Sequence, residues 1–248
     1  MKKLDNLLLQ SDNDIPFEEA LTVIHNPSLK EISMYGEEVF HIGLRFLLFS
    51  KNSLDDEDKS RLEGQSDFSI FMTVMNNRNI HADHKTNARK VLDLLFPGVQ
   101  ITFKKDQILL QKEKENIVAS INSQNFMRFK EILDQMFCLG TIAKDQYNPK
   151  GALAKKIAEK LAKAHEKIDK MKNKKEGRIG IFDQYVSILS VGLGKDKNEL
   201  MNYTVYQIRD EFKRYVLKMN SDIYLKTKLA GAQGLDEVEN WMEELDSI

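Results

Sequence analysis

Two histidines three positions apart form the most metal-like grouping in this sequence. His81 and His84 would share one face of a helix, so that both imidazoles could reach one ion. A closed metal site needs about four ligands, and no other His, Cys or carboxylate pair stands out as a partner. We therefore expect two exposed histidines at a helix start and no metal. A hydrolase with a metal on His81 and His84 is the least favoured of three functional hypotheses.

Two further groupings suggest chemistry but do not fit it. Gly192-Leu193-Gly194-Lys195 has the glycines and lysine of a phosphate loop, but a phosphate loop follows a strand and continues with Ser or Thr. Here a helical pattern precedes, and Asp196 follows. Cys138 lies in an apolar run, which favours a buried, inert thiol over a nucleophile. We predict that the protein has no catalytic residue and no cofactor.

The composition indicates an ordinary globular chain without a charge-driven partner. Of its 248 residues 42% are hydrophobic and 30% are charged, and the formal net charge is -1. A net charge this close to zero gives no reason to expect binding to nucleic acid, to a membrane surface or to an acidic substrate. One cysteine excludes an internal disulfide and a multi-cysteine metal cage. We see no signal peptide and no apolar stretch of roughly 20 residues, so we expect a reducing cytoplasm and no membrane.

Hydrophobic periodicity predicts an α+β fold that is mostly helical. We expect an irregular start over residues 1–19, a strand at 21–24, and helices at 28–35, 39–49, 68–75, 82–96 and 126–139. Alternating apolar residues from Val99 to Val118, separated by short polar turns, predict a small antiparallel sheet.

The best domain boundary lies at Asn148-Pro149-Lys150-Gly151. We predict a mixed α+β region over residues 1–147 and an all-helical region over 148–248, since no strand pattern follows Pro149. One helix of roughly 25 residues should follow Thr204, striped by Val205, Ile208, Phe212, Tyr215, Met219 and Ile223.

A lysine-covered helical segment, residues 155–178, allows two interpretations. Its ten basic and four acidic residues could bind phosphates, as in a nucleic-acid-associated phage or regulatory protein. However, it has no interleaved aromatic residues and almost no arginine with which to read bases. Ile157, Leu161 and Ile168 belong to a heptad seam. We favour a solvated helix that packs or self-associates along this seam.

The C-terminal segment suggests a contact surface. The long helix should end at Leu229-Ala230, because Gly231 and Gly234 follow it. The acidic segment beyond carries Trp241, the single tryptophan of the chain, beside Met242. These two side chains either cap the helix or anchor a partner. Our predicted partner-binding residues are Ile157, Leu161, Ile168, Gly231, Gly234, Trp241 and Met242.

A series of segments in the C-terminal third resembles the tail assembly chaperones of long-tailed phages and prophages of Gram-positive bacteria. In order, these are Asn148-Pro149, Lys155 to Leu161, Ile181 to Leu189, Gly192-Leu193-Gly194, Leu200 to Ile208, Phe212 to Tyr224, Ala230 to Gly234 and Glu239-Asn240-Trp241-Met242. Nearer the N-terminus, Pro27 to Ile32 and Tyr35 to Glu38 are similar to the front half of related phage proteins.

This resemblance implies a non-enzymatic assembly factor. Such chaperones coat the hydrophobic tape-measure protein while major tail tube subunits polymerise around it. They act in the host cytoplasm and are absent from the mature virion. The expected partners are therefore the tape-measure protein and the major tail tube protein, together with self-association. A helical body with methionine-rich faces suits reversible binding of apolar helices.

Overall fold

The computed structural model describes residues 3–18, 22–51, 56–77, 82–112, 117–139, 181–231 and 242. The elements before the larger sheet are α1 (Asn6–Gln10), β1 (Ile15–Glu18), β2 (Thr22–Ile24), α2 (Leu29–Tyr35), α3 (Glu37–Leu47), α4 (Asp56–Arg61), α5 (Asp67–Asn76) and α6 (Ala82–Leu95). The sheet strands are β3 (Val99–Phe103), β4 (Gln107–Lys112) and β5 (Ile117–Asn122). The remaining helices are α7 (Phe126–Met136), α9 (Ile181–Leu193), α10 (Lys197–Met201) and α11 (Val205–Leu229).

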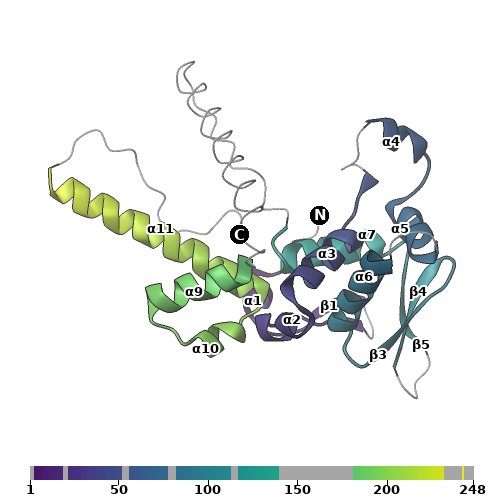
Figure 1. Ribbon diagram of the computed structural model, residues 1–248, viewed down its shortest axis with the longest axis horizontal. Helices are drawn as coiled ribbons and strands as arrows, with labels where there is room; N and C mark the ends of the chain where they lie inside the picture. Colours follow the sequence, from purple (N-terminus) through teal and green to yellow (C-terminus); the bar gives the residue numbers. More distant parts are fainter. Residues whose placement is uncertain are drawn as a thin grey trace.

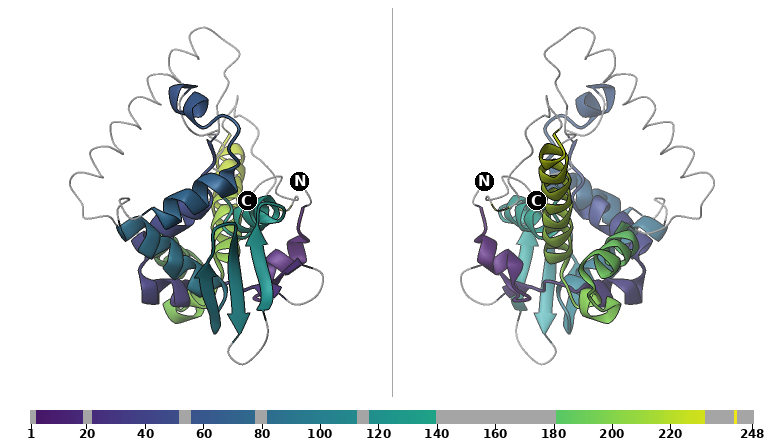
Figure 2. Two further views of the ribbon diagram at one scale, coloured as in Figure 1. Left: turned by 90° about the vertical axis from the view of Figure 1, so that its right-hand side faces the viewer. Right: turned by 90° about the vertical axis from the view of Figure 1, so that its left-hand side faces the viewer.

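This architecture confirms the predicted fold class, α+β and mostly helical. The predicted antiparallel sheet has the order β3-β4-β5, and its strands lie side by side at one end of the molecule (Figures 1 and 2). The prediction of an irregular start over residues 1–19 was wrong. Asp5 caps α1 by accepting a hydrogen bond from the backbone N–H of Leu7 at 2.7 Å, and β1 pairs antiparallel with β2.

Two of the predicted helix starts carry reciprocal caps. The Ser28 side chain accepts from the N–H of Glu31, and Glu31 Oε2 accepts from the N–H of Ser28 at 2.8 Å. At the start of α11, Thr204 Oγ1 and Gln207 form the same pair of bonds, at 3.3 and 2.8 Å. Each cap satisfies amide groups that the first turn of a helix leaves without a partner, which fixes where both helices begin.

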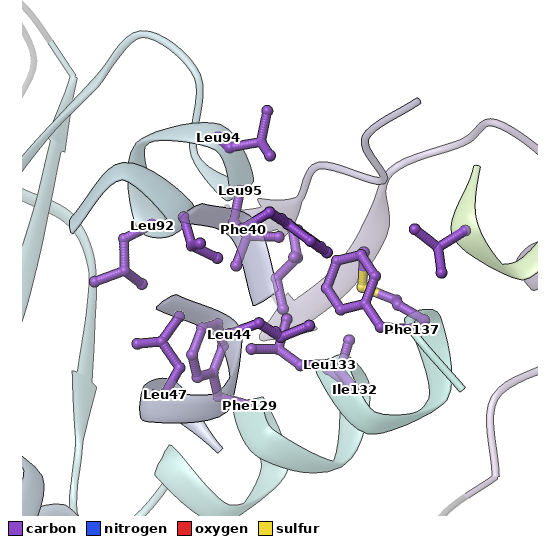
Figure 3. Packing of buried hydrophobic residues seen from close by; sticks show 14 of the residues in the cluster. Phe40, Leu44, Leu47, Leu92, Leu94, Leu95, Phe129, Ile132, Leu133 and Phe137 are labelled. Carbon is purple, nitrogen blue, oxygen red and sulfur yellow. The ribbon is translucent and has the colours of Figure 1, made fainter. Parts of the chain in front are cut away.

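The core lies where α3, α6 and α7 meet. Phe40, Leu44 and Leu47 of α3 and Leu92 and Leu95 of α6 are fully or almost fully buried (Figure 3). From the end of α7, the Phe137 ring meets Phe40 edge to face, with centroids 5.2 Å apart. Aromatic pairs with this geometry add to the apolar area that they bury, so this cluster is a principal source of stability.

The C-terminal helices pack into the same core. Phe182, Val186 and Leu189 of α9 and Ile208 of α11 are buried in one cluster with the N-terminal residues. The sequence-predicted boundary between residues 147 and 148 lies outside the described residues.

Backbone contacts join the two regions as well. Ser28 forms an isolated antiparallel bridge with Thr204, and the N–H of Leu29 donates to the carbonyl of Tyr203 at 2.9 Å. Gln207 Nε2 donates to the carbonyl of Gln10 at 2.6 Å, and Arg209 Nη1 donates to that of Cys138 at 2.6 Å. These bonds hold the start of α11 against the body.

Candidate functional site

The first half of α11 is anchored in the body. Val205 is 1% exposed and Ile208 is 0% exposed, and the next stripe residues, Phe212 and Tyr215, are partly buried. The Phe212 ring packs on Tyr185 of α9 with centroids 4.4 Å apart and planes inclined by 32°. Stripe residues 205, 208, 212 and 215 thus lie against the core, as a 3.6-residue helical period requires.

The apolar stripe of α11 continues along the second half of the helix, where it is exposed to solvent. We call residues 216–229 the distal half. Its stripe residues Met219 and Ile223 are 43% and 56% exposed, although their spacing continues the buried one. Figure 1 shows α11 extending well past α9 and α10, away from the rest of the molecule. At 1.5 Å per residue, a 25-residue helix is about 37 Å long. The body covers only its first half.

Other apolar and charged side chains accompany this stripe. Leu225 and Leu229 are 52% and 87% exposed, and they point away from Ile223 because each residue turns a helix by about 100°. The distal half holds three lysines, Lys218, Lys226 and Lys228, and one acid, Asp222. Clustered exposed apolar side chains mark interaction surfaces in soluble proteins. The arrangement suits an apolar partner helix with acidic flanks.

A lysine holds the loop between α9 and α10 against α11. Lys195 Nζ donates to Tyr203 Oη at 2.7 Å and to Glu211 Oε1 at 3.0 Å. The hydrogen bond to Tyr203 raises the pKa of Lys195, with Glu211 adding to the effect against a smaller opposing effect of burial. Gly194 makes the turn before it, with φ +67°. The lysine of the glycine-containing loop therefore joins elements within the fold.

A second contact seats the start of α9 on α3. Glu37 Oε1 accepts from the backbone N–H of Phe182 at 3.0 Å and lies 3.2 Å from His41 Nε2. Burial raises the pKa of Glu37, but the bonds from His41 and Phe182 outweigh it, so that the net pKa is lowered. The His41 ring also packs on Phe182, with centroids 5.0 Å apart. A carboxylate at a helix N-terminus is stabilising, and this one orients α9.

The predicted partner-binding residues are described only in part. Gly231 ends α11 as expected, with φ +88°, a left-handed conformation that glycine adopts without strain. Met242 is 70% exposed. Ile157, Leu161, Ile168, Gly234, Trp241 and the whole lysine-rich segment 155–178 lie outside the described residues.

The groups that the sequence suggested for chemistry are His81, His84 and Cys138. His84 is exposed on α6, and His81 lies outside the described residues. Within the described ranges, no three His, Cys, Asp or Glu side chains are grouped so that they could hold a metal ion. Cys138 is buried, and burial raises its pKa to about 12, so its thiol is protonated and a weak nucleophile at neutral pH. No helix in the described ranges is long and apolar enough to cross a membrane.

The sequence analysis found the α11 stripe but did not select its distal half as a site. Periodicity shows which residues share a face, yet it does not show where the body stops covering that face. The length of the predicted helix was the signal that part of it would be uncovered, because a helix of about 37 Å exceeds the roughly 30 Å diameter of a small domain.

A family model described as the YomV second domain matches residues 172–246, which include α9, α10 and α11. No curated protein and no solved structure matches the chain. The matched segment covers less than a third of the chain and contains the whole distal half of α11. YomV is a phage-like protein family, so this match relates residues 172–246 to phage proteins.

Proposed function

We propose that this protein is a phage tail assembly chaperone that works by binding and has no enzymatic activity. It would hold the tape-measure protein while major tail tube subunits polymerise around it in the host cytoplasm, and it would be absent from the mature virion. The observation that carries the proposal is the exposed stripe of Met219 and Ile223 on the distal half of α11. The match to a phage-like family over the same residues supports it, as does the resemblance of the C-terminal segments to such chaperones.

The geometry favours a helical partner. Val216, Met219 and Ile223 follow the three- and four-residue spacing of one helix face and are all at least partly exposed. A second amphipathic helix can place its own apolar side chains between them. Methionine adapts its shape to different partner side chains, which suits a chaperone that must bind many successive segments of one long apolar protein.

Affinity for each segment should be moderate. The distal half is a single helix with no second wall beside it in the described structure (Figure 1). A partner therefore buries limited apolar area, and association also costs translational and rotational freedom. Moderate affinity agrees with release of the tape measure as the tube advances.

Co-purification with matched variants tests the proposal. Tape-measure fragments would be co-expressed with wild-type protein, with Met219→Asp/Ile223→Asp, and with Leu225→Asp/Leu229→Asp. Both variants replace two exposed apolar residues four positions apart by aspartate, but only the first alters the stripe. We expect the stripe variant to lose the fragments and the other variant to retain them. Thermal melts of all three proteins check that the fold is kept.

Two results would contradict the proposal. Equal retention of tape-measure fragments by the two folded variants would show that the stripe is not the binding surface. Failure of the wild-type protein to retain any fragment, with a normal phage yield for the stripe variant, would exclude the chaperone function itself.

A further inference from the structure

The apolar stripe of α11 already packs against one helix within the fold. α9 covers the stripe as far as Tyr215, where Gly192 lies so close to the Tyr215 ring that a Cβ would overlap it. Beyond this contact the stripe continues through Met219 and Ile223, which are exposed. The exposed part is therefore the continuation of a helix–helix interface. Its 14 residues, 216–229, offer about 21 Å to a second helix of similar length.

The two edges of the exposed stripe differ in charge. On one edge, Lys226 follows Met219 by seven residues and Ile223 by three, so its exposed side chain lies beside theirs. On the other edge, Asn220 and Thr227 are uncharged, and the Thr227 hydroxyl already donates to the carbonyl of Ile223 at 2.8 Å. Within the distal half, a helix that lies on the stripe meets a positive charge along one edge and none along the other.

The two lysines of the last turn have different surroundings. Lys228 lies over the Tyr224 ring, with Nζ 5.6 Å from its centroid, and it points about 140° away from Ile223 because each residue turns a helix by about 100°. In the part of the chain that the structure describes, neither an ion pair nor an aromatic ring occupies Lys226, although Asp222 lies one turn before it. Both lysines are equally favoured by the helix dipole, so only their position relative to the stripe separates them.

We propose that the distal half binds an amphipathic helix of a partner protein that carries an acidic side chain at the edge of its apolar face, opposite Lys226. Apolar side chains of that helix pack between Met219 and Ile223. The acidic side chain pairs with Lys226 and selects against partner helices with basic edges. The inference rests on the proposed function for the use of this stripe, and it adds the chemistry that the partner helix must have.

Synthetic peptides of about 18 residues, or five helical turns, test this chemistry with the full-length protein. The acidic peptide repeats Leu at three- and four-residue spacing, with Glu on both edges of the Leu face and Gln elsewhere, so that either orientation presents a Glu to Lys226. In the basic peptide, Lys replaces every Glu. In a third peptide, Pro replaces one central Gln of the acidic peptide and prevents a continuous helix.

Fluorescence anisotropy of labelled peptides gives the affinities. We expect the acidic peptide to bind about fivefold or more tightly than the basic peptide, the scale of one exposed ion pair, and the proline peptide not to bind. At about 1 M salt, where charges act over only ~3 Å, the acidic and basic peptides should bind equally.

Matched variants locate the preference. Lys226→Glu should reverse the order of the acidic and basic peptides. Lys228→Glu makes the same charge change in the same turn on another face, and it should retain the wild-type order. Met219→Asp/Ile223→Asp should bind none of the peptides. Thermal melts check that each variant keeps the fold.

Several outcomes would overturn the proposal. These are equal binding of the acidic and basic peptides at low salt, an equal effect of Lys226→Glu and Lys228→Glu, and full binding of the proline peptide. Peptide binding that appears only after deletion of residues 235–248 would assign the surface to the acidic segment of this chain. A dimer that Met219→Asp/Ile223→Asp dissociates would assign it to a second copy. Either result would exclude a partner helix.

The peptide experiment and the co-purification experiment fail independently. Retention of tape-measure fragments by a protein that does not distinguish the acidic from the basic peptide would refute this inference and leave the proposed function intact. Selective binding of the acidic peptide without retention of any tape-measure fragment would refute the proposed function and leave this inference intact.

Discussion

Gly43 of α3 lies directly against the backbone carbonyl of Asn87 on α6. A Cβ built on residue 43 would overlap this carbonyl and also meet Val91 Cγ2. α3 and α6 carry much of the core, including Phe40, Leu44 and Leu92 (Figure 3). Because a backbone atom cannot rotate away, the two helices can pack this closely only if residue 43 has no side chain.

We predict that Gly43→Ala destabilises the protein by about 1–3 kcal/mol, the usual cost of overpacking a core. Gly192→Ala is the matched control. A Cβ there would meet the tip of the Tyr215 side chain, which can move, and both substitutions gain the same helix propensity, about 1 kcal/mol. Urea unfolding of both variants measures the difference. Equal midpoints would show that the helices can separate slightly without loss.

His25 links stability to pH. Its Nδ1 lies 2.8 Å from Asp14 Oδ1, and its Nε2 lies 3.0 Å from Glu31 Oε1. Burial lowers the pKa of His25, but hydrogen bonds and attraction from these two carboxylates outweigh burial, and the net pKa is raised above 6.5. The charged form is therefore favoured by folding.

This stabilisation should be fully present below pH 6.5, the ordinary value, and should be lost as pH rises through the higher folded pKa. Thermal unfolding from about pH 5.5 to 8.5 should show a fall in Tm that is absent in His25→Gln. An NMR titration that places the His25 pKa below the ordinary value would contradict the prediction.

A buried ion pair ties α7 to α5. Lys130 Nζ lies 2.8 Å from Asp67 Oδ2 and donates to the carbonyl of Phe49 at 2.8 Å, and the two charged side chains are 9% and 11% exposed. Removing one partner of such a pair leaves a buried charge without compensation. We expect Lys130→Met to cost about 3–5 kcal/mol, measured by denaturant unfolding. The double variant Lys130→Met/Asp67→Asn should lose less, and equal losses would refute the coupling.

The same pair predicts acid sensitivity. Burial raises the pKa of Asp67, but Lys130 and the backbone N–H of Lys51 outweigh burial, so that the net pKa is lowered. Its contribution to stability is present above the ordinary value of 3.8 and is lost as pH falls through the folded value. In Asp67→Asn, the free energy of unfolding should depend less on pH in this acidic range.

Trp241 reports on the segment after Gly231. We predict that this segment and a tape-measure helix compete for the helix of Val205 to Leu229, because a short amphipathic segment buries little area and opens at low cost. Adding a tape-measure fragment should shift the Trp241 emission. Deleting residues 235–248 should leave a folded protein that aggregates more readily. If the Trp241 emission stayed unchanged although binding was demonstrated, the segment would be only a structural cap.

Most helices and strands could be predicted from local sequence patterns. Ser28 and Thr204 mark helix starts in the sequence because their side chains cap the first turn. The alternation of Val99, Ile101 and Phe103 with polar residues reveals β3 because successive side chains of a strand point to opposite faces. β4 does not alternate in this way, since Ile108, Leu109 and Leu110 are all buried. The start of the chain was missed for the opposite reason. The short elements α1 and β1 are held by tertiary contacts, such as the burial of Leu9 and Ile15, rather than by strong local preferences.

The candidate sites were less accessible to sequence reasoning. Met219 and Ile208 belong to one stripe, and only packing against α9 decides that Ile208 is buried and Met219 is exposed. The predicted seam of Ile157, Leu161 and Ile168 stays a prediction.

α11 is one continuous helix from its capped start at Thr204 to Leu229. The backbone around Met219 and Ile223 is therefore helical before any partner arrives. Ordering a backbone costs about 1–2 kcal/mol per residue, and here folding has already met that cost. The surface is preorganised, so a partner would have to order only itself, and the distal half could release one segment and accept the next without refolding.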